Sequence, residues 1–395
     1  MNFAFFTLGC KVNQYETQCL REGFTDLGHK IVLENADFDV AVINSCTVTA
    51  ESDRKTRQLL HRIRRKKPNA VIVLTGCMVE AFPEESAMLL AADIVVGNTD
   101  ITKILKLTEE FLKNGERIVE INPHKTGEKF NTPNISSFAE RTRAYMKIED
   151  GCDRFCSYCI IPTARGRVRS KPLCEIKKEA EKLAQNGFSE AVLVGINLSA
   201  YGKGEEINLC DAVETVCAVD GIKRVRLGSL EPDHISDEML VRFKNQEKFC
   251  PQFHLSLQSG CNATLKRMNR HYDSAFYYDL ICRIRKMFPT SSITTDVMVG
   301  FAGETEEEFS ESLDFVKKVG FAKAHVFAYS RREGTMAYSL ANQVTNAIKS
   351  ERSKLMINAA NESEKEFLSN QIGKVFPVLF ETEQDGFAEG YTPNY

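Results

Sequence analysis

The sequence predicts an α/β protein in which an open, doubly wound parallel sheet precedes a partial (β/α)6 barrel. Short apolar runs alternate with amphipathic stretches over residues 1–121 and again over residues 141–346, and a polar run lies between them. Alternation of this kind predicts parallel sheets that are covered by helices. A chain of 395 residues is also longer than one ordinary domain.

The first region, residues 1–121, is expected to form an N-terminal domain. Four apolar runs predict buried strands, at Phe3–Leu8, Val40–Ile43, Val71–Leu74 and Ile94–Val96. Helical patterns fall between these strands, at Tyr15–Leu27, Ala50–Lys67 and Phe82–Ala91. Residues 122–140 form a predicted linker, because prolines, a glycine and serines interrupt the apolar pattern there.

Residues 141–346 contain six further strand and helix units, which is the pattern of an incomplete (β/α) barrel. The expected strands are Ala144–Ile148, Ala191–Gly195, Arg224–Leu227, Phe253–Leu257, Ile293–Val299 and Ala324–Tyr329. Helical stretches separate them, for example at Cys174–Asn186 and Thr305–Val319. Such barrels place their chemistry at the C-terminal ends of the strands.

The C-terminal region combines a polar helix with a short β segment. A helical pattern covers Ile348–Asn370, within an expected connecting segment of residues 347–372. A strand is predicted at Lys374–Phe380 and a turn at Asp385–Gly386. Residues 373–395 are too few for an independent β domain, so we expect an incomplete β module.

Composition narrows the class of protein. Hydrophobic residues make up 43% of the chain and charged residues 27%, which is typical of a soluble globular protein. We expect a cytoplasmic protein without membrane contact, because the chain has neither a membrane-spanning apolar run nor a signal segment. Thirteen cysteines in such a protein indicate metal or redox sites. The net charge of −3 requires any nucleic-acid contact to come from a local basic surface.

The strongest local signal is a C-x3-C-x2-C loop directly after the first barrel strand, formed by Cys152, Cys156 and Cys159. Three thiolates on one loop can bind three irons of a [4Fe–4S] cluster and leave the fourth iron open to a small molecule. A zinc knuckle is the alternative, although a structural zinc site normally needs four protein ligands.

A second group of cysteines is dispersed but regular. Cys10, Cys46 and Cys77 each follow a predicted strand, and 36 and 31 residues separate them. The C-terminal ends of parallel strands meet at one edge, where ligands of open α/β sheets bind. Gly9 and Gly76 allow close backbone turns there. These thiols predict a second three-cysteine cluster site, and three buried core cysteines are the alternative.

The loop from Cys152 to Cys159, with Tyr158 before its last cysteine, resembles the radical SAM superfamily. This implies that the open iron chelates the amino and carboxylate groups of S-adenosylmethionine (SAM), which one electron then cleaves to a 5′-deoxyadenosyl radical. Over almost its full length the chain resembles the radical SAM methylthiotransferase family, in the segments LGCKVNQYET, INSCTVTAESDRKTRQ, EDGCDRFCSYCIIPTARGRVRS, LGSLEPDHI, HLSLQSGCNATLKRMNRHYD, TTDVMVGFAGET and YSRREGT.

LGCKVNQYE and NSCTVT resemble the bacterial branch that modifies C2 of N6-threonylcarbamoyladenosine in tRNA. The resemblance implies two [4Fe–4S] clusters and two SAM per turnover, one donating a methyl group to sulfur and one supplying the radical. The implied cluster ligands are Cys10, Cys46, Cys77, Cys152, Cys156 and Cys159. We also expect a monomer that receives electrons from a low-potential donor such as flavodoxin or ferredoxin.

Two positions depart from the family pattern. Ala302 and Ala328 stand where the family usually has proline, and neither change removes a ligand. Residues 373–395 resemble the start of the TRAM module, the family's small β-barrel for tRNA.

Polar residues near barrel strand ends are the candidates for binding SAM. We expect the pocket to include Tyr158, Asn197, Ser229, Glu231, Gln258 and Asp296. Loop capping is the alternative role for the polar residues at the strand ends. His254 opens a predicted buried strand and is expected to be a satisfied core histidine.

Two basic segments are candidate contacts for a tRNA anticodon stem-loop. The predicted helix over residues 52–67 carries eight cations, Arg54, Lys55, Arg57, Arg62, Arg64, Arg65, Lys66 and Lys67. Arg165, Arg167 and Arg169 follow the cluster loop and are expected near the chemistry. A solvated helix face is the alternative for the first segment.

Other functions stay open at this point. The enzyme alternatives are a methylthiotransferase for isopentenyladenosine in tRNA or for an aspartate of a ribosomal protein. The non-enzyme alternatives are an iron–sulfur electron carrier and a zinc-binding RNA module.

Overall fold

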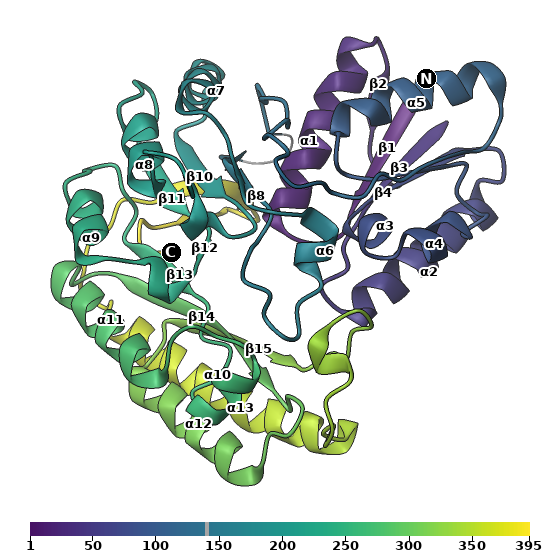
Figure 1. Cartoon of the computed structure of the whole chain (residues 1–395). Helices are drawn as coiled ribbons and strands as arrows, with labels where there is room; N and C mark the ends of the chain where they lie inside the picture. Colours follow the sequence, from purple (N-terminus) through teal and green to yellow (C-terminus); the bar gives the residue numbers. More distant parts are fainter. Residues whose placement is uncertain (139–141) are drawn as a thin grey trace.

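The computed structural model describes residues 1–138 and 142–395, which form two α/β units side by side (Figure 1). The N-terminal unit is built on a six-stranded, fully parallel sheet of order β2-β1-β3-β4-β5-β6. Its strands are β1 (Asn2–Thr7), β2 (Lys30–Val32), β3 (Val40–Ser45), β4 (Val71–Gly76), β5 (Ile94–Val96) and β6 (Ile118–Glu120). The two short edge strands β2 and β6 have no long apolar run and are absent from the prediction.

Helices cover both faces of this sheet. They are α1 (Lys11–Asp26), α2 (Ala50–Lys66), α3 (Cys77–Ala81), α4 (Pro83–Ala87) and α5 (Ile101–Asn114). α1 and α5 pack on one face and α2 and α3 on the other, because alternate residues of each strand point to opposite faces. The predicted open, doubly wound sheet is therefore confirmed.

The helix predicted at Phe82–Ala91 is present but shorter, as α4, which ends at Ala87. Phe82 is not helical, and Pro83 starts the separate five-residue helix α4 as its first residue. Proline has no N–H to continue a preceding helix but suits the first position of a new one.

The segment between the two units is packed against α1. Both carboxylate oxygens of Glu22 accept hydrogen bonds from the backbone and side chains of Ser136 and Ser137. Ile135 and Phe138 are buried. The end of the predicted linker, and the boundary expected at residue 141, lie outside the described residues.

The second unit is a partial parallel barrel whose strands follow one another in chain order. They are β7 (Arg143–Lys147), β10 (Glu190–Val194), β11 (Arg224–Leu227), β12 (Ser229–Leu230), β13 (Gln252–Leu255), β14 (Ser292–Val299) and β15 (Lys323–Ala328). β7, β10 and β11 form one sheet and β12 to β15 another. β11 and β12 adjoin at Gly228, and a bridge from Val225 to Phe249 pairs β11 with the segment just before β13. The predicted (β/α)6 architecture is confirmed.

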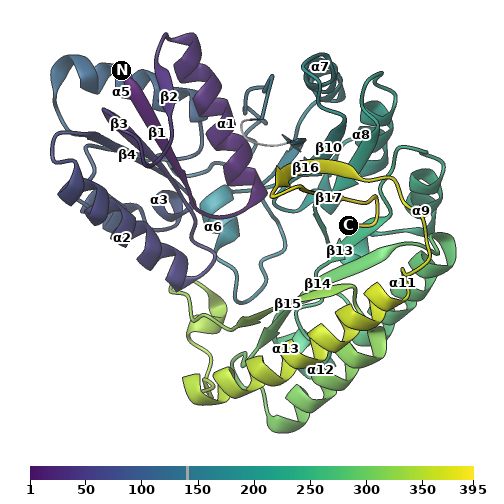
Figure 2. The same ribbon diagram turned by 180° about the vertical axis from the view of Figure 1, so that it is seen from behind.

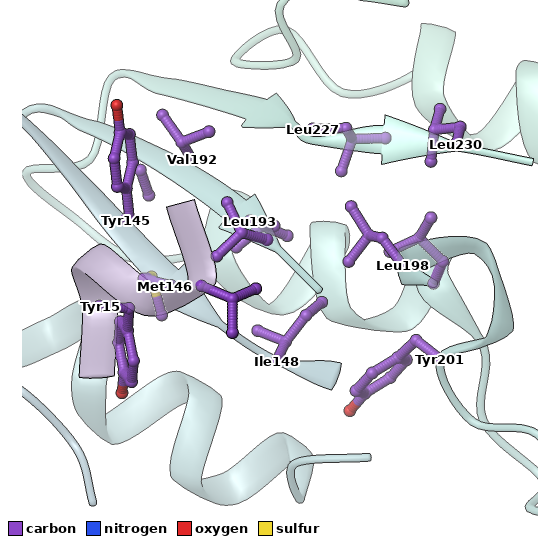
Figure 3. Close-up of a cluster of buried hydrophobic side chains, with 14 of the residues drawn as sticks. Tyr15, Tyr145, Met146, Ile148, Val192, Leu193, Leu198, Tyr201, Leu227 and Leu230 are labelled. Carbon is purple, nitrogen blue, oxygen red and sulfur yellow. The ribbon is translucent and has the colours of Figure 1, made fainter. Parts of the chain in front are cut away.

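Helices surround this barrel and leave one side to the N-terminal unit. They are α6 (Ile161–Arg165), α7 (Leu173–Gln185), α8 (Leu209–Cys217), α9 (Asp237–Lys244), α10 (Asn262–Arg267), α11 (Ser274–Met287), α12 (Glu306–Val319) and α13 (Asn346–Ser369). In the apolar core of Figure 3, Met146, Leu193 and Leu227 come from barrel strands and Tyr15 from α1. One hydrophobic core therefore spans both units.

A C-terminal hairpin lies at the N-terminal ends of the barrel strands (Figure 2). It comprises β16 (Leu379–Gln384) and β17 (Phe387–Tyr391), and its turn has positive φ at Asp385 and Gly386, as predicted. Most of the strand predicted at Lys374–Phe380 is wrong, since β16 begins only at Leu379. Three arginines on β7 and β11 hold the hairpin through Glu381 and backbone carbonyls: Arg143, Arg224 and Arg226. Within the described residues, no helix has the length and apolar character needed to cross a bilayer.

Candidate active site between two cysteine groups

The N-terminal cysteine group converges at the C-terminal edge of the first sheet. Cys10 follows β1, Cys46 follows β3, and Cys77 begins α3 directly after β4. Gly9 has φ +116°, and a Cβ there would lie 2.8 Å from Cys46 Cβ and 3.1 Å from its Sγ. Gly76 has φ +98°, and a Cβ there would collide with the backbone of Ser45. Both glycines are therefore needed to bring the three cysteine-bearing loops together.

A buried arginine from the barrel unit reaches this group. Arg165, the last residue of α6, donates from Nε to Cys77 Sγ at 3.1 Å and from a terminal nitrogen to Asn13 Oδ1 at 3.0 Å. The same Asn13 oxygen accepts from Cys10 Sγ at 3.4 Å. Burial raises the pKa of the Cys77 thiol to about 12, and the Arg165 charge partly offsets this effect. The Arg165 charge favours the thiolate form of Cys77, which is the form that binds iron, against the larger effect of burial.

Arg165 belongs to a buried ionic network at the seam between the units. Its guanidinium pairs with Glu16 of α1, whose carboxylate also accepts from Lys147 Nζ at 2.7 Å. Lys147 bonds Asp150 at 2.8 Å, and Arg169 bonds Asp150 at 3.1 Å. The prediction that Arg165 and Arg169 contact tRNA is therefore wrong, since both side chains are buried and neutralise carboxylates.

Replacing Arg165 with methionine is expected to lower the free energy of unfolding by about 3 kcal/mol, because it removes one partner from a buried ionic network. Urea denaturation of the purified protein measures this change. Arg167→Met, two residues away with 56% of its side chain exposed, is the matched control and should cost no more than about 0.5 kcal/mol. Equal effects of the two substitutions would contradict the structural role of Arg165.

The second cysteine group occupies one loop between the short strand β8 (Glu149–Asp150) and α6. Cys152, Cys156 and Cys159 are each partly exposed. A hydrogen bond from Cys159 N–H to Cys156 O at 2.9 Å closes a turn within the loop. Burial and the neighbouring Cys156 raise the pKa of Cys159 to about 12. The three thiols are close enough to interact electrostatically.

A second buried arginine serves this loop. Arg270, just after α10, donates to Cys156 Sγ at 3.2 Å and also pairs with Glu231. Arg154 lies 3.6 Å from the same carboxylate. Sequence reasoning missed Arg270, although it lies in the family segment MNRHYD, because its contact with the cysteine loop crosses 114 residues. The Glu231 carboxylate, predicted to bind SAM, is thus engaged in orienting Arg270.

The other predicted SAM residues divide among three places. Tyr158, Gln258 and Asp296 line one cavity of about 220 Å³ beside Cys159, which Thr49 of the N-terminal unit also lines. Asn197 is buried near Glu149, and one oxygen of each side chain has no hydrogen-bond partner among the described residues. Ser229 is exposed and lines a separate chamber inside the barrel. The structure therefore brings together three of the six.

Both cysteine groups have the donor chemistry of a [4Fe–4S] site, with three thiols on adjacent loops in the first group and on one loop in the second. In such a cluster each thiolate binds a different iron. In the described part of the chain, no three His, Cys, Asp or Glu side chains converge as ligands of a single metal ion. The unpartnered buried oxygens of Glu149 and Asn197 are suited to hydrogen-bond a polar group held beside Cys152, as a bound SAM would offer.

Two basic surfaces remain accessible. Along α2, a groove of about 600 Å³ is lined by arginines and a histidine, including Arg54, His61, Arg62 and Arg65. Arg167, beside the cysteine loop, stacks over the exposed Phe155 ring with 4.7 Å between its guanidinium and the ring centre. Exposed cations with a stacking aromatic are typical of surfaces that bind single-stranded nucleic acid.

The fold resembles those of known radical SAM proteins. The radical S-adenosylmethionine methyltransferase TsrM from Kitasatospora setae superposes with a TM-score of 0.62 at 14% identity, covering 85% of this chain and 76% of TsrM. The cobalamin-dependent S-adenosylmethionine radical enzyme OxsB superposes with a TM-score of 0.52 at 12% identity, covering 93% of this chain and 56% of OxsB. Both comparisons support the shared arrangement of an α/β unit beside a partial barrel.

Sequence comparison gives the family. The model of the radical SAM superfamily matches residues 146–316, and that of the uncharacterized protein family UPF0004 matches residues 2–97. The threonylcarbamoyladenosine tRNA methylthiotransferase MtaB of Bacillus subtilis is 38% identical to this chain, over 99% of this chain and 88% of that protein. The MtaB of Aquifex aeolicus is also 38% identical, over 99% of this chain and 95% of that protein. The tRNA-2-methylthio-N(6)-dimethylallyladenosine synthase of Pelotomaculum thermopropionicum is 33% identical, over 98% and 89%. With such identity over nearly the whole length of these relatives, the chain belongs to the radical SAM methylthiotransferase family.

Proposed function

We propose that this protein transfers a methylthio group to C2 of N6-threonylcarbamoyladenosine beside the anticodon of tRNA. The observation that carries the proposal is the pair of three-cysteine groups on facing edges of the two units. The helix α6 connects them, since it begins two residues after Cys159 and its last residue, Arg165, donates to Cys77. The relatives named for threonylcarbamoyladenosine, at 38% identity, support the choice of base.

Each cysteine group holds one [4Fe–4S] cluster in this proposal. Cys152, Cys156 and Cys159 bind the cluster that, with SAM, supplies a 5′-deoxyadenosyl radical, and Cys10, Cys46 and Cys77 bind the cluster that carries the sulfur. Arg165 and Arg270 each direct an N–H at one ligand sulfur, at 3.1 and 3.2 Å. Hydrogen bonds to ligand sulfurs raise the reduction potential of a cluster and stabilise its reduced state.

The protein side chains position SAM and the base and limit the access of water. Tyr158, Gln258 and Asp296 line the cavity beside Cys159 and face Thr49 of the N-terminal unit, so the reacting groups lie between the two units. Asn197 and Glu149 offer the unpartnered polar oxygens on the other side of the loop. Burial raises the pKa of Glu149 well above its usual range, which favours the protonated form that can donate a hydrogen bond.

RNA binding is proposed for the surfaces that remain exposed. Cations along α2 contact phosphates, and Arg167 with Phe155 offers a stacking surface close to the cysteine loop. The target base must leave its stack to reach a site between the two units. We further propose that the protein acts in the cytoplasm as a monomer, with a low-potential electron donor such as flavodoxin or ferredoxin.

The direct test is nucleoside mass spectrometry of a tRNA that carries N6-threonylcarbamoyladenosine, after incubation with anaerobically reconstituted protein, SAM, a sulfide source and dithionite. The expected product is the 2-methylthio derivative of that nucleoside. A parallel reaction on a tRNA with isopentenyladenosine should give little product. Product only from the isopentenyladenosine tRNA would overturn the proposed substrate.

Replacing Arg62, Arg65 and Lys66 of α2 together with alanine is expected to weaken tRNA binding about tenfold at physiological salt, because phosphate contacts dominate such affinity. The slope of log K against log salt concentration should also fall by about 2. Fluorescence anisotropy across a salt series measures both. The matched control replaces the exposed Lys177, Lys178 and Lys182 of α7, which changes the charge equally. Equal losses in both variants would show that α2 makes no specific contact.

A further inference from the structure

The interior of the barrel contains a polar chamber to which the proposed function assigns no ligand. Its volume is about 560 Å³, within the range of small-ligand sites. Inward positions of a small barrel are mostly filled by branched apolar side chains. Here alternate residues of three neighbouring strands are polar, and they are Gln252 and His254 on β13, Ser292 and Thr294 on β14, and Lys323 and His325 on β15.

The polar residues form a connected row across the strands. His254 pairs in register with Thr294, and Thr294 with Lys323. His254 Nδ1 lies 2.9 Å from Thr294 Oγ1, and its ring centre lies 6.0 Å from that of His325. The prediction of a satisfied histidine holds for His254, but its environment is a chamber wall. Lys323 Nζ is half-exposed and 3.6 Å from Glu364 of α13.

The chamber adjoins the reacting centre. His254 Nε2 lies 3.3 Å from Asp296 Oδ2, and Asp296 also lines the cavity beside Cys159. Lys11, which directly follows Cys10, lines the chamber from the side of the N-terminal unit. The chamber and the cavity beside Cys159 therefore meet at the His254–Asp296 pair.

We propose that this chamber receives the threonylcarbamoyl side chain of the target adenosine, with its carboxylate held near Lys323 and His325. The inference rests on the proposed function and deepens it. The side chain offers a carboxylate, a hydroxyl and a urea group, which match the donors and acceptors of the chamber wall. A dimethylallyl substituent offers none, so it would displace the water around His325 and Lys323 without replacing the hydrogen bonds that this water makes. Sites built on hydrogen bonds reject analogues that lack the matching groups far better than apolar pockets do.

The test compares three anticodon stem-loops that differ only in the target base, which is N6-threonylcarbamoyladenosine, adenosine or isopentenyladenosine. Wild-type protein is expected to show kcat/KM at least about 100-fold higher for the first than for the other two. His325→Leu and Lys323→Met should each reduce this selectivity ratio about tenfold or more. Lys317→Met, on the exposed face of α12, is the control for the lysine change and should keep the wild-type ratio.

The outcomes separate the two proposals. If wild-type protein modifies the threonylcarbamoyl substrate but the variants keep its selectivity, the chamber assignment is overturned and the function stands. If both variants raise the KM for SAM and leave RNA selectivity intact, SAM occupies the chamber instead. If wild-type protein cleaves SAM but modifies none of the three RNAs, the proposed function fails, and the chamber assignment fails with it.

Discussion

Replacing Cys156 with alanine is expected to abolish reductive cleavage of SAM. The three cysteines of the loop each bind one iron in the proposed cluster, and the loop sequence from Gly151 to Ile160 holds no fourth cysteine to substitute for Cys156. The substitution also leaves the Arg270 guanidinium, 3.2 Å from Cys156 Sγ, facing a methyl group. The measurement is the amount of 5′-deoxyadenosine formed with dithionite as reductant, quantified by chromatography. For the Cys156 variant this amount should fall below detection.

The iron content gives a second readout of the same change. Reconstituted wild-type protein should hold about eight irons per chain, and the variant about four, because only the N-terminal site remains intact. Cys174→Ala is the matched control, since Cys174 is exposed on α7 and lies outside both cysteine groups. It should keep both the iron and the SAM cleavage. Continued 5′-deoxyadenosine formation by the Cys156 variant would contradict the ligand assignment.

Sequence reasoning located both cysteine groups because each follows a simple rule. Cys152, Cys156 and Cys159 lie on one loop, so their proximity requires no knowledge of the fold. Cys10, Cys46 and Cys77 are far apart in sequence, but the ends of parallel strands meet at one edge, and the βα spacing is enough to predict it. The same spacing predicted both sheets.

The electrostatic partners of these groups could not be found in this way. Arg165, Arg167 and Arg169 look equivalent in the segment ARGRVR, yet the first is fully buried and the second is exposed. The difference depends on Glu16, which lies 149 residues from Arg165 and comes from the other unit. The local sequence around Arg165 does not indicate a contact with a residue so far away in the chain. Arg270 was missed for the same reason.

Replacing Cys46 with alanine is expected to separate the two halves of the chemistry. Cleavage of SAM to 5′-deoxyadenosine should continue, since the loop with Cys156 is untouched, while the methylthio product should be lost. Cys46 lies directly after β3 and within contact distance of the position a Cβ on Gly9 would take, next to the loop of Cys10. Iron should again fall from about eight to about four per chain. Nucleoside mass spectrometry and 5′-deoxyadenosine assays on one reaction measure both effects.

Cys19→Ala is the control for this change, because Cys19 is also a buried cysteine of the N-terminal unit, and its thiol donates to a backbone carbonyl, Pro133 O, at 3.5 Å. If Cys46 were a core residue like Cys19, either substitution would cause a similar small loss of stability and would leave the iron content and the product unchanged. Methylthio product from the Cys46 variant would thus return Cys10, Cys46 and Cys77 to the role of core residues. Loss of product with retained SAM cleavage, seen for Cys46 and not for Cys19, would locate sulfur delivery at the edge of the N-terminal sheet and radical formation in the barrel.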